Sequence, residues 1–222
     1  MQLETYPDRE MMMLSLANII AGQLGEFLRR DGRATLSVPG GTTPGPIFDT
    51  LSGVDLDWAN VAVVLNDERW VPEASDRSNT RLVRERLIRG RAVQARLLPL
   101  YAPADAPEDM LAALEDGLRA HLPISVLLLG MGADMHTASL FPGADRLEEA
   151  LTSTALILPM RADAAGEPRV TLTASVLKAA FNIHILITGA EKRAALDRAL
   201  TLTPLEAPVR VLLDTATVHW AE

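Results

Sequence analysis

An aspartate and a histidine stand two residues apart in a glycine-rich segment, and this pair is the clearest sign of chemistry in the chain. The segment Leu127–Pro142 reads LLLGMGADMHTASLFP and places Asp134 and His136 directly after an apolar run. Histidine can take up and return a proton near neutral pH, and a neighbouring carboxylate can steady its charged form. We therefore expect His136 to transfer a proton and Asp134 to support it.

The other three histidines lack this setting. His121 lies at the end of an expected helix, His184 lies inside a β run, and His219 lies near the C-terminus. The chain has no cysteine, no pair of histidines at helical spacing and no other cluster of ligand-type side chains. We expect no metal and no cofactor at the site.

A second glycine-rich segment, PGGTTP at Pro39–Pro44, follows an apolar strand-like run. Adjacent glycines let the backbone approach a ligand closely, and the N-terminus of a following helix offers free N–H groups to an anion. No Gly-Lys-Ser/Thr occurs in the chain, which disfavours a nucleotide P-loop and ATP. The segment is either an ordinary turn or a phosphate site built by Gly40, Gly41, Thr42 and Thr43.

Charged residues also follow the next strand-like run, in the segment NDERWVP at Asn66–Pro72. Asp67 or Glu68 could bind sugar hydroxyls, and Arg69 could pair with a phosphate through its planar fork. The same charges could instead form an internal ion pair that shapes the loop. Ser78-Asn79 is expected to cap the helix that comes next.

Lysine is scarce, because only Lys178 and Lys192 occur in the chain. Lys192 lies where a β run, Asn182–Thr188, gives way to a helix, a position suited to a phosphate contact. It could equally be a solvated helix residue. Arg169 and Arg161 are further candidate cations.

These groups need a scaffold, and the pattern of apolar residues predicts one. Helices are expected over Glu10–Arg30, Pro44–Leu51, Asn79–Ile88, Pro107–His121, Ala174–Ala180 and Gly189–Leu200. Strands are expected over Ala34–Val38, Val61–Leu65, Leu97–Leu100, Ser125–Leu129, Ala155–Leu158, Val170–Thr173, Asn182–Thr188 and Val209–Leu213.

Strands that alternate with helices pair in parallel through right-handed crossovers. The expected fold class is therefore α/β, a doubly wound and mostly parallel sheet flanked by helices. In such sheets, ligands bind beyond the carboxyl ends of the strands. No repeat, low-complexity tract or linker interrupts the 222 residues, so residues 1–222 are expected to form a single domain.

Composition limits the kinds of partner that we expect for the protein. The net charge of −8 argues against nucleic acid as the main partner. Uninterrupted apolar runs fall short of the roughly 18 residues that a membrane helix needs, and no basic flank or cleavage site of a signal peptide is present. We expect a cytoplasmic protein without a membrane partner, either a monomer or a weak homo-oligomer.

Together these motifs resemble the glucosamine-6-phosphate isomerase/6-phosphogluconolactonase family, and the lactonase branch in particular. The matching segments extend over nearly the whole chain: SVPGGTTP (Ser37–Pro44), NDERWVP with the later Ser78-Asn79, LGMGADMHTASLFPG (Leu129–Gly143), EPRVTLT (Glu167–Thr173) and TGAEK (Thr188–Lys192). The string Thr137–Pro142 and DERWVP are similar to the lactonase form. Deaminases tend to carry a HIAFNEP-like string with a glutamate, which this chain lacks.

The resemblance implies a NagB/RpiA-like α/β fold and hydrolysis of 6-phospho-D-glucono-1,5-lactone to 6-phospho-D-gluconate in the oxidative pentose phosphate pathway. It implies His136 as the proton-transfer residue, with Asp134 beside it and no cofactor. The substrate-binding residues that it implies are Gly40, Gly41, Thr42, Thr43, Asp67, Arg69, Asn79, Arg169 and Lys192. The only partner that it implies is the sugar-phosphate lactone.

One residue departs from the family pattern. Met135 stands between the aspartate and the histidine, where the family usually has glycine. If that position needs a positive φ, methionine would strain the loop or shift it. Two other functions stay open: a deaminase or isomerase acting on glucosamine 6-phosphate, and a non-catalytic sugar-phosphate sensor. A sensor usually carries an attached DNA-binding module, and no spare basic segment of that kind is present.

Overall fold

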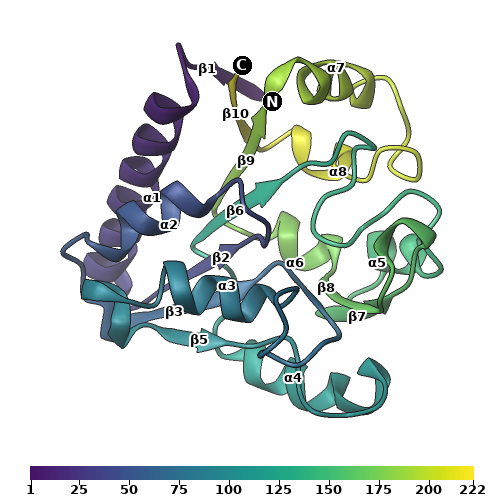
Figure 1. The fold of residues 1–222 in the computed structure, drawn as a ribbon, viewed down its shortest axis with the longest axis horizontal. Helices are drawn as coiled ribbons and strands as arrows, with labels where there is room; N and C mark the ends of the chain where they lie inside the picture. The colour runs from purple at the N-terminus through teal and green to yellow at the C-terminus, as the bar shows by residue number, and fades with distance from the viewer.

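A seven-stranded parallel sheet forms the centre of the molecule, in the order β1-β10-β9-β6-β2-β3-β5 (Figure 1). The computed structural model describes residues 1–222, with the side chains of residues 1–163 and 165–222. Every residue of β2 and β3 is buried, as expected for a parallel sheet covered on both faces. The strands are β1 (Gln2–Thr5), β2 (Ala34–Val38), β3 (Val61–Leu65), β5 (Arg96–Leu98), β6 (Val126–Gly130), β9 (Asn182–Thr188) and β10 (Thr217–Ala221).

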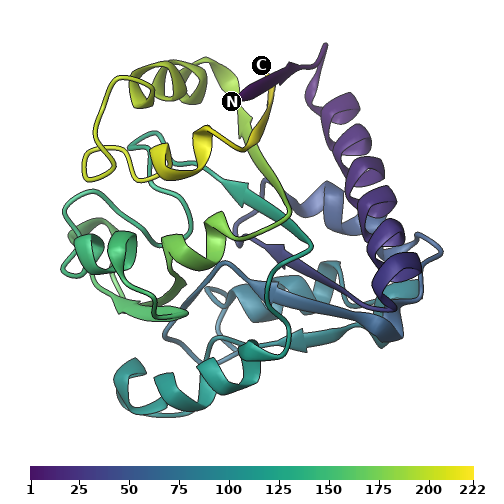
Figure 2. The same ribbon diagram turned by 180° about the vertical axis from the view of Figure 1, so that it is seen from behind.

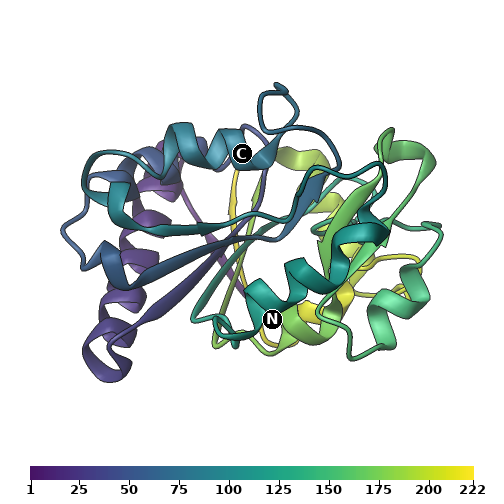
Figure 3. The ribbon, with the colours of Figure 1, turned by 90° about the horizontal axis from the view of Figure 1, so that it is seen from below.

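Helices cover both faces of this sheet. Figure 1 shows α2 and α3 in front of the strands, and Figure 2, from behind, shows α6 and α8 on the opposite face. Seen from below, α3 and α4 lie on opposite sides of the sheet (Figure 3). The helices are α1 (Arg9–Asp31), α2 (Gly45–Ser52), α3 (Asn79–Arg86), α4 (Leu111–Arg119), α5 (Leu147–Thr152), α6 (Ala174–Lys178), α7 (Gly189–Ala199) and α8 (Arg210–Leu213).

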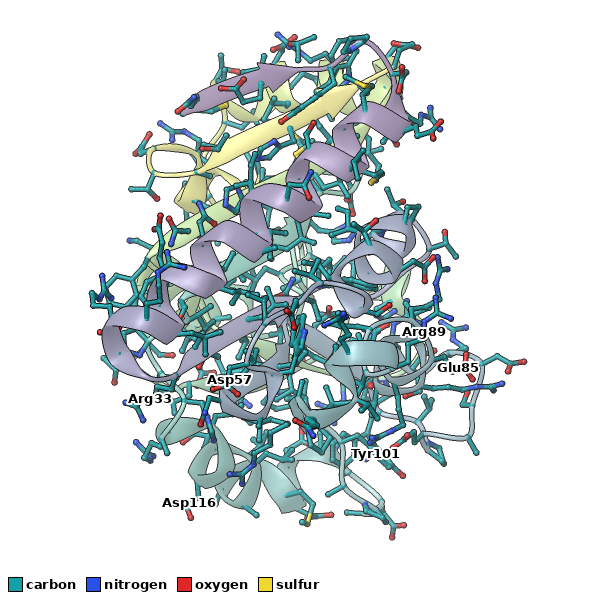
Figure 4. The ribbon with its side chains drawn as sticks, turned by 90° about the vertical axis from the view of Figure 1, so that its left-hand side faces the viewer. Arg33, Asp57, Glu85, Arg89, Tyr101 and Asp116 are labelled. Atoms are coloured by element: carbon teal, nitrogen blue, oxygen red, sulfur yellow. The ribbon has the colours of Figure 1, made fainter. Side chains whose placement is uncertain are left out.

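Helix α1 is the longest and lies diagonally across one side of the molecule, with Arg33 just beyond its lower end (Figure 4). Its first turn is capped by Asp8, whose carboxylate accepts from Met11 N at 2.7 Å. By length and composition alone α1 could cross a membrane, because its most apolar window has a mean hydropathy of 1.3. Uninterrupted apolar runs in the sequence did not single out this helix. Its inner face, which includes Met12, Leu16 and Ile20, is buried in the core.

A small antiparallel sheet, β4-β8-β7, stands beside the carboxyl edge of the main sheet. It consists of β4 (Asp67–Arg69), β8 (Arg169–Leu172) and β7 (Ile157–Met160). The register places Arg69 directly opposite Arg169. Two cations that are far apart in sequence therefore face the same region.

The chain reverses its direction of travel across the main sheet between β2 and β6. From β2 it proceeds through β3 to the β5 edge, whereas from β6 it proceeds through β9 to β10. The loops that follow adjacent strands then diverge and leave a crevice at their carboxyl ends. Here those loops are the glycine segment after β2 and the Asp134–His136 segment after β6.

The structure confirms the α/β class, the mostly parallel sheet and the main helices and strands, most of them with shifts of one or two residues at their ends. One prediction was wrong, and two further details of the structure were not predicted. Val209–Leu213 is not a strand: α8 occupies Arg210–Leu213, because a short apolar run suits a buried helical turn as well as a strand. The segment Pro107–His121 begins as a 3-10 helix over Pro107–Met110 before α4. The strands near Ala155–Leu158 and Val170–Thr173 pair antiparallel in the small sheet.

Three strands were missed, namely β1, β4 and β10. β1 pairs with β10, so the two ends of the chain lie side by side at one edge of the sheet (Figure 1). β4 lies within a segment that the sequence indicates only as a polar loop. These short strands owe their pairing to partners remote in sequence, which local patterning does not report.

Candidate active site

A cavity of about 360 Å³ opens at the carboxyl edge of β2 and β6, where the chain reverses direction. It brings together nine of the eleven residues predicted for the site. These are Gly40, Gly41, Thr43, Asp67, Arg69, Asn79, His136, Arg169 and Lys192. Thr42 instead lines an adjoining groove between α1 and α2, and Asp134 lies behind His136.

His136 and Asp134 form a close pair. Nδ1 of His136 lies 2.6 Å from Oδ1 of Asp134, which also accepts from the backbone N–H of His136 at 3.2 Å. The hydrogen bond from His136 holds the pKa of the Asp134 carboxyl below its ordinary value. An ionised carboxylate can only accept, so Nδ1 carries a proton, and in the neutral imidazole Nε2 then keeps a free lone pair. The geometry thus orients a neutral imidazole as a base.

The loop that carries this pair is closed on itself. The amide of Gly132 donates to the carbonyl of His136 at 3.0 Å, and the amide of Met135 donates to the carbonyl of Gly132 at 3.0 Å. A Cβ at Gly132 would lie 2.2 Å from His136 Nδ1 and 2.4 Å from Asp134 Oδ1. Only glycine leaves room for the pair at this position.

Met135 has φ of +66°, in the left-handed region. From the sequence we expected strain here if the position needs a positive φ, and it does: glycine adopts this conformation without strain, whereas methionine does not. The residue is held there by its carbonyl, which accepts from Val209 N at 3.1 Å, and by partial burial of its side chain against the core. The loop keeps its shape despite the methionine.

Phe141 separates the histidine from a buried cation. Its ring centroid lies 4.4 Å from that of His136, and the guanidinium carbon of Arg169 lies 5.8 Å from the Phe141 ring centroid. Phe141 is 7% exposed and lines the cavity. The ring fixes the plane of the imidazole and keeps the two nitrogenous groups apart.

Arg69 and Arg169 form a pair of like charges on neighbouring strands. Like charges directly opposite each other across a sheet destabilise it unless an anion compensates. Burial lowers the pKa of Arg169, and the nearby Arg69 charge lowers it further, while Asp67 at 3.7 Å acts in the opposite direction. The Nε atoms of both arginines are buried without a hydrogen-bond partner in the described part of the chain. These donors are suited to an anionic ligand.

Asp67 is buried and held from the far side of the cavity. Its Oδ2 accepts from Ser139 Oγ at 2.5 Å, and Ser139 N donates to Thr171 Oγ1 at 3.2 Å. The β6 loop, β4 and β8 are thereby joined behind the cavity. Asp67 also supplies the carboxylate nearest to Arg169.

The glycine segment after β2 is packed against Asn79. A Cβ at Gly40 would lie 1.9 Å from Oδ1 of Asn79, so this residue must be glycine. Asn79 in turn donates from Nδ2 to the carbonyl of Asp67 at 2.9 Å. Helix α2 begins just beyond this segment at Gly45, whose amide donates to the carbonyl of Thr42 at 3.2 Å, and its second residue, Pro46, has no N–H.

Lys192 lines the cavity from the first turn of α7. Arg161, the weaker candidate, lies elsewhere: it pairs with Glu108 at 2.6 Å and does not line the cavity. The site therefore combines Arg69, Arg169 and Lys192 in one cavity of a protein whose net charge is −8. A local concentration of cations is what an acidic protein needs to bind an anion.

Sequence reasoning missed Asn66 and gave Glu68 a role that the structure does not support, although both residues are important for the site geometry. Asn66 is fully buried: it accepts from Ser37 Oγ at 2.6 Å and donates to the carbonyl of Leu128 at 2.7 Å. It thus joins β2 and β6 immediately beneath the cavity. Glu68 could have bound a sugar hydroxyl by sequence, but it is fully buried and does not line the cavity. For Asn66 the available signal was a polar residue directly after the apolar run Val61–Leu65, whereas Glu68, between Asp67 and Arg69, carries no such signal.

His121, His184 and His219 lie outside the cavity. Within the described side chains, no group of three or more histidine, aspartate or glutamate residues is placed to hold a metal ion. What the cavity offers is an oriented imidazole, the buried carboxylate of Asp67 and hydrogen-bond donors of positive charge. This combination suits proton transfer to and from an anionic substrate.

The sheet topology and the position of the cavity define the chain as an open α/β protein with its ligand site at a topological switch point. A family model described as "Glucosamine-6-phosphate isomerases/6-phosphogluconolactonase" matches residues 7–220. The chain belongs to this family, and it is an enzyme of the lactone-hydrolase branch.

Comparisons with individual relatives support this family membership. A 6-phosphogluconolactonase from Mesorhizobium japonicum is 44% identical, over 97% of this chain and 93% of the relative. The crystal structure of a 6-phosphogluconolactonase from Shewanella baltica has a TM-score of 0.97 at 34% identity, covering 100% of this chain and 97% of that one. A monomeric glucosamine-6-phosphate deaminase of the NagB superfamily, 17% identical over 99% of this chain and 97% of its own, has a TM-score of 0.81. That likeness confirms the NagB-like fold.

Proposed function

We propose that the enzyme hydrolyses 6-phospho-D-glucono-1,5-lactone to 6-phospho-D-gluconate, as a step of the oxidative pentose phosphate pathway. The observation that carries this proposal is the His136–Asp134 pair, joined at 2.6 Å and facing a cavity that also holds Arg69, Arg169 and Lys192. A base within reach of a water molecule and cations for a phosphate are the two things that this reaction needs. The names of the relatives support the choice of lactone.

In the mechanism that we propose, Nε2 of neutral His136 accepts a proton from water as the water oxygen attacks the lactone carbonyl carbon. The imidazolium that forms is steadied by ionised Asp134 through Nδ1–H. The bond from the carbonyl carbon to the ring oxygen then breaks, and the proton on Nε2 passes to that oxygen. A lactone is an activated ester, so positioning and proton transfer are sufficient without a covalent intermediate or cofactor.

The developing oxyanion needs hydrogen-bond donors. The amides of Gly130–Gly132 are natural candidates from the sequence, but the Gly132 amide already donates to the His136 carbonyl. The role of Gly132 is therefore to make room for the acid–base pair rather than to bind the oxyanion.

For the phosphate we propose the opposite end of the cavity. Gly40, Gly41 and Thr43 would present backbone and hydroxyl groups there, and Thr42 would support them from the adjoining groove. The cations Arg69, Arg169 and Lys192 would neutralise its charge. Asp67 and Asn79 would act as supports through the contacts described above.

We further propose that the enzyme works in the cytoplasm, as a monomer or weak homo-oligomer, without nucleic-acid or membrane partners. The charge of −8 supports the first exclusion, and the packing of the inner face of α1 into the core supports the second. Sedimentation at several protein concentrations, with and without lipid vesicles, tests the assembly state and the membrane exclusion.

Acid release on mixing the protein with freshly made 6-phosphogluconolactone, corrected for spontaneous hydrolysis, tests the proposed reaction. We expect release well above the spontaneous rate. Ammonia release from glucosamine 6-phosphate would identify a deaminase instead. Binding of sugar phosphates without any turnover would identify a sensor.

A further inference from the structure

Glu68 is a buried carboxylate that the proposed mechanism does not use. It lies in β4 between Asp67 and Arg69, and alternation along the strand directs its side chain away from the cavity that its two neighbours line. Its exposed fraction is 0%. No cation lies within 4.0 Å of its oxygens among the described side chains. A buried charge in such a place needs other compensation.

Five hydrogen bonds from neutral donors provide that compensation. Oε1 accepts from Arg69 N and Asn79 N, both at 2.8 Å. Oε2 accepts from Thr80 N at 2.7 Å, Thr80 Oγ1 at 2.8 Å and Ser78 Oγ at 3.2 Å. Most of these donors belong to the first turn of α3, where N–H groups lack partners within the helix and a negative charge is favoured.

The contacts continue from Glu68 to both walls of the cavity. Asn79, held through its backbone N–H, donates from its side chain to the carbonyl of Asp67 and lies against Gly40 of the glycine segment. Arg69 is held through its own backbone N–H. Glu68 thus supplies most of the hydrogen bonds that hold the start of α3 against β4, next to the part of the cavity between Gly40 and Arg69, and Asn79 Nδ2 adds one more.

We propose that Glu68 is a positioning residue for substrate binding, which acts through Asn79 and Arg69 by the reach and acceptor capacity of its side chain. This inference rests on the proposed function, because it concerns the same cavity. It makes Glu68 important for KM and leaves the proton-transfer pair, which lies on the β6 loop, largely unaffected.

Two conservative substitutions separate reach from charge. Glu68→Gln keeps the reach and can keep an oxygen toward Arg69 N and Asn79 N, with its amide toward the hydroxyls of Ser78 and Thr80, which can turn to accept. Thr80 N then loses its acceptor, but the two bonds through which Glu68 would act are kept. Glu68→Asp keeps the charge but withdraws the carboxylate by one methylene from α3. Ser78→Ala is the matched control: it removes one bond to Glu68 and the cap of α3 without releasing Asn79 N.

The measurements are kcat and KM for the lactone, and calorimetric binding of 6-phosphogluconate, for the wild type and the three variants. We expect Glu68→Asp to raise KM and the product dissociation constant about tenfold, while kcat changes less than about threefold. In Glu68→Gln and Ser78→Ala, KM and the product dissociation constant should stay within about threefold of the wild type. A purely structural role would lower the unfolding temperature of Glu68→Asp and leave KM unchanged, which would overturn the inference. A KM rise in Ser78→Ala equal to that in Glu68→Asp would overturn it too.

A double variant provides a second test, which the binding of 6-phosphogluconate can report even if the activity is low. If Glu68 acts in part through Asn79, then in an Asn79→Ala background Glu68→Asp should raise KM and the product dissociation constant by a smaller factor than it does in the wild type, because only the contact with Arg69 N remains to be affected. Additive effects would contradict the inference. An inactive wild type that still binds 6-phosphogluconate would refute the proposed reaction, and the binding arm would continue to test Glu68.

Discussion

At the residue scale, the site depends on a histidine whose two ring nitrogens have different tasks. Asp134 fixes the proton on Nδ1 and leaves Nε2 free toward the cavity, while Phe141 sets the ring plane. The pKa of Asp134 is lowered by its bond to His136, so this carboxylate stays ionised throughout the neutral range. The carboxylate is therefore available to accept from Nδ1–H of His136 at neutral pH.

Met135 allows the strain in this loop to be measured. Met135→Gly and Met135→Ala both remove the partly buried side chain, but only glycine relieves the positive φ. The left-handed conformation costs a non-glycine residue ~1–2 kcal/mol, and the greater flexibility of unfolded glycine offsets part of that gain. We expect the Gly variant to be more stable than the Ala variant by about 1 kcal/mol in urea unfolding. Equal stability, or a more stable Ala variant, would show that the loop carries no strain here.

Sequence reasoning identified most of the cavity residues, because their types are unusual after apolar runs. Gly40 and His136 could each be singled out in this way, and Arg169 stands just before a strand-like run. Asn66 and Glu68 could not be given their roles, since their partners come from strands and helices that only the folded chain brings near. The catalytic and binding roles of all these residues stay predictions until variants are measured.

At the scale of elements, the β6 loop illustrates how a short glycine motif places two functional groups. Gly130 and Gly132 flank Met131, yet their surroundings differ completely. A Cβ at Gly130 would meet nothing within 4 Å, whereas one at Gly132 would collide with both His136 and Asp134. The motif thus contains one essential glycine for the pair and one tolerant position.

This contrast gives a matched prediction. Gly132→Ala should lower kcat by at least about tenfold, because His136 and Asp134 must separate to admit the methyl group. Gly130→Ala should stay within about threefold of the wild type. Steady-state kinetics on the lactone measures both variants. Equal effects would mean that the distance between the pair does not control turnover.

Most of the main elements were predicted to within two residues at their ends, but a short apolar run can be assigned to the wrong type of element. α1 and the strands β2, β3 and β9 follow their expected ranges closely. The apolar run Val209–Leu213 was assigned to a strand, although Leu212 N donates to the carbonyl of Val209 at 3.0 Å in a helical turn. The real last strand, β10, is recognisable only through its pairing with β1 and β9.

At the scale of the whole molecule, one contiguous hydrophobic core runs from α1 through the sheet to α8. We infer from this core that residues 1–222 fold as a single domain. A chain of hydrogen bonds also crosses it: Tyr6 OH to His219 Nδ1 at 2.9 Å, His219 Nε2 to His184 Nδ1 at 3.0 Å, and His184 Nε2 to Gln23 Oε1 at 2.9 Å. Each histidine uses one nitrogen as donor and the other as acceptor, so both must be neutral.

This network predicts how stability depends on pH. Burial lowers the pKa of His184 to about 4, and burial together with His184 lowers the pKa of His219 to about 3. In the unfolded chain both titrate near 6.5, so between pH ~6.5 and ~4 the unfolded state binds more protons. The free energy of unfolding should therefore fall as pH decreases through this window, by up to ~1.4 kcal/mol per pH unit for each histidine.

Urea unfolding at pH 7, 6 and 5 measures this loss, and a double variant with H184Q and H219Q provides the control. We expect one cooperative transition at each pH and a flatter pH dependence in the control. A wild type whose stability is unchanged from pH 7 to pH 5 would contradict the buried neutral pair. Two separate transitions would contradict the single domain.

The most direct test of the account is the rate of lactone hydrolysis by the wild type and by His136→Ala. Acid release from fresh 6-phosphogluconolactone is followed at pH 7 and corrected for spontaneous hydrolysis, and calorimetric binding of 6-phosphogluconate is measured in parallel. We predict that His136→Ala loses kcat by at least ~100-fold while product binding changes less than about threefold, since the phosphate-binding groups are intact. An unchanged kcat in His136→Ala would show that this histidine is not the base and would contradict the account.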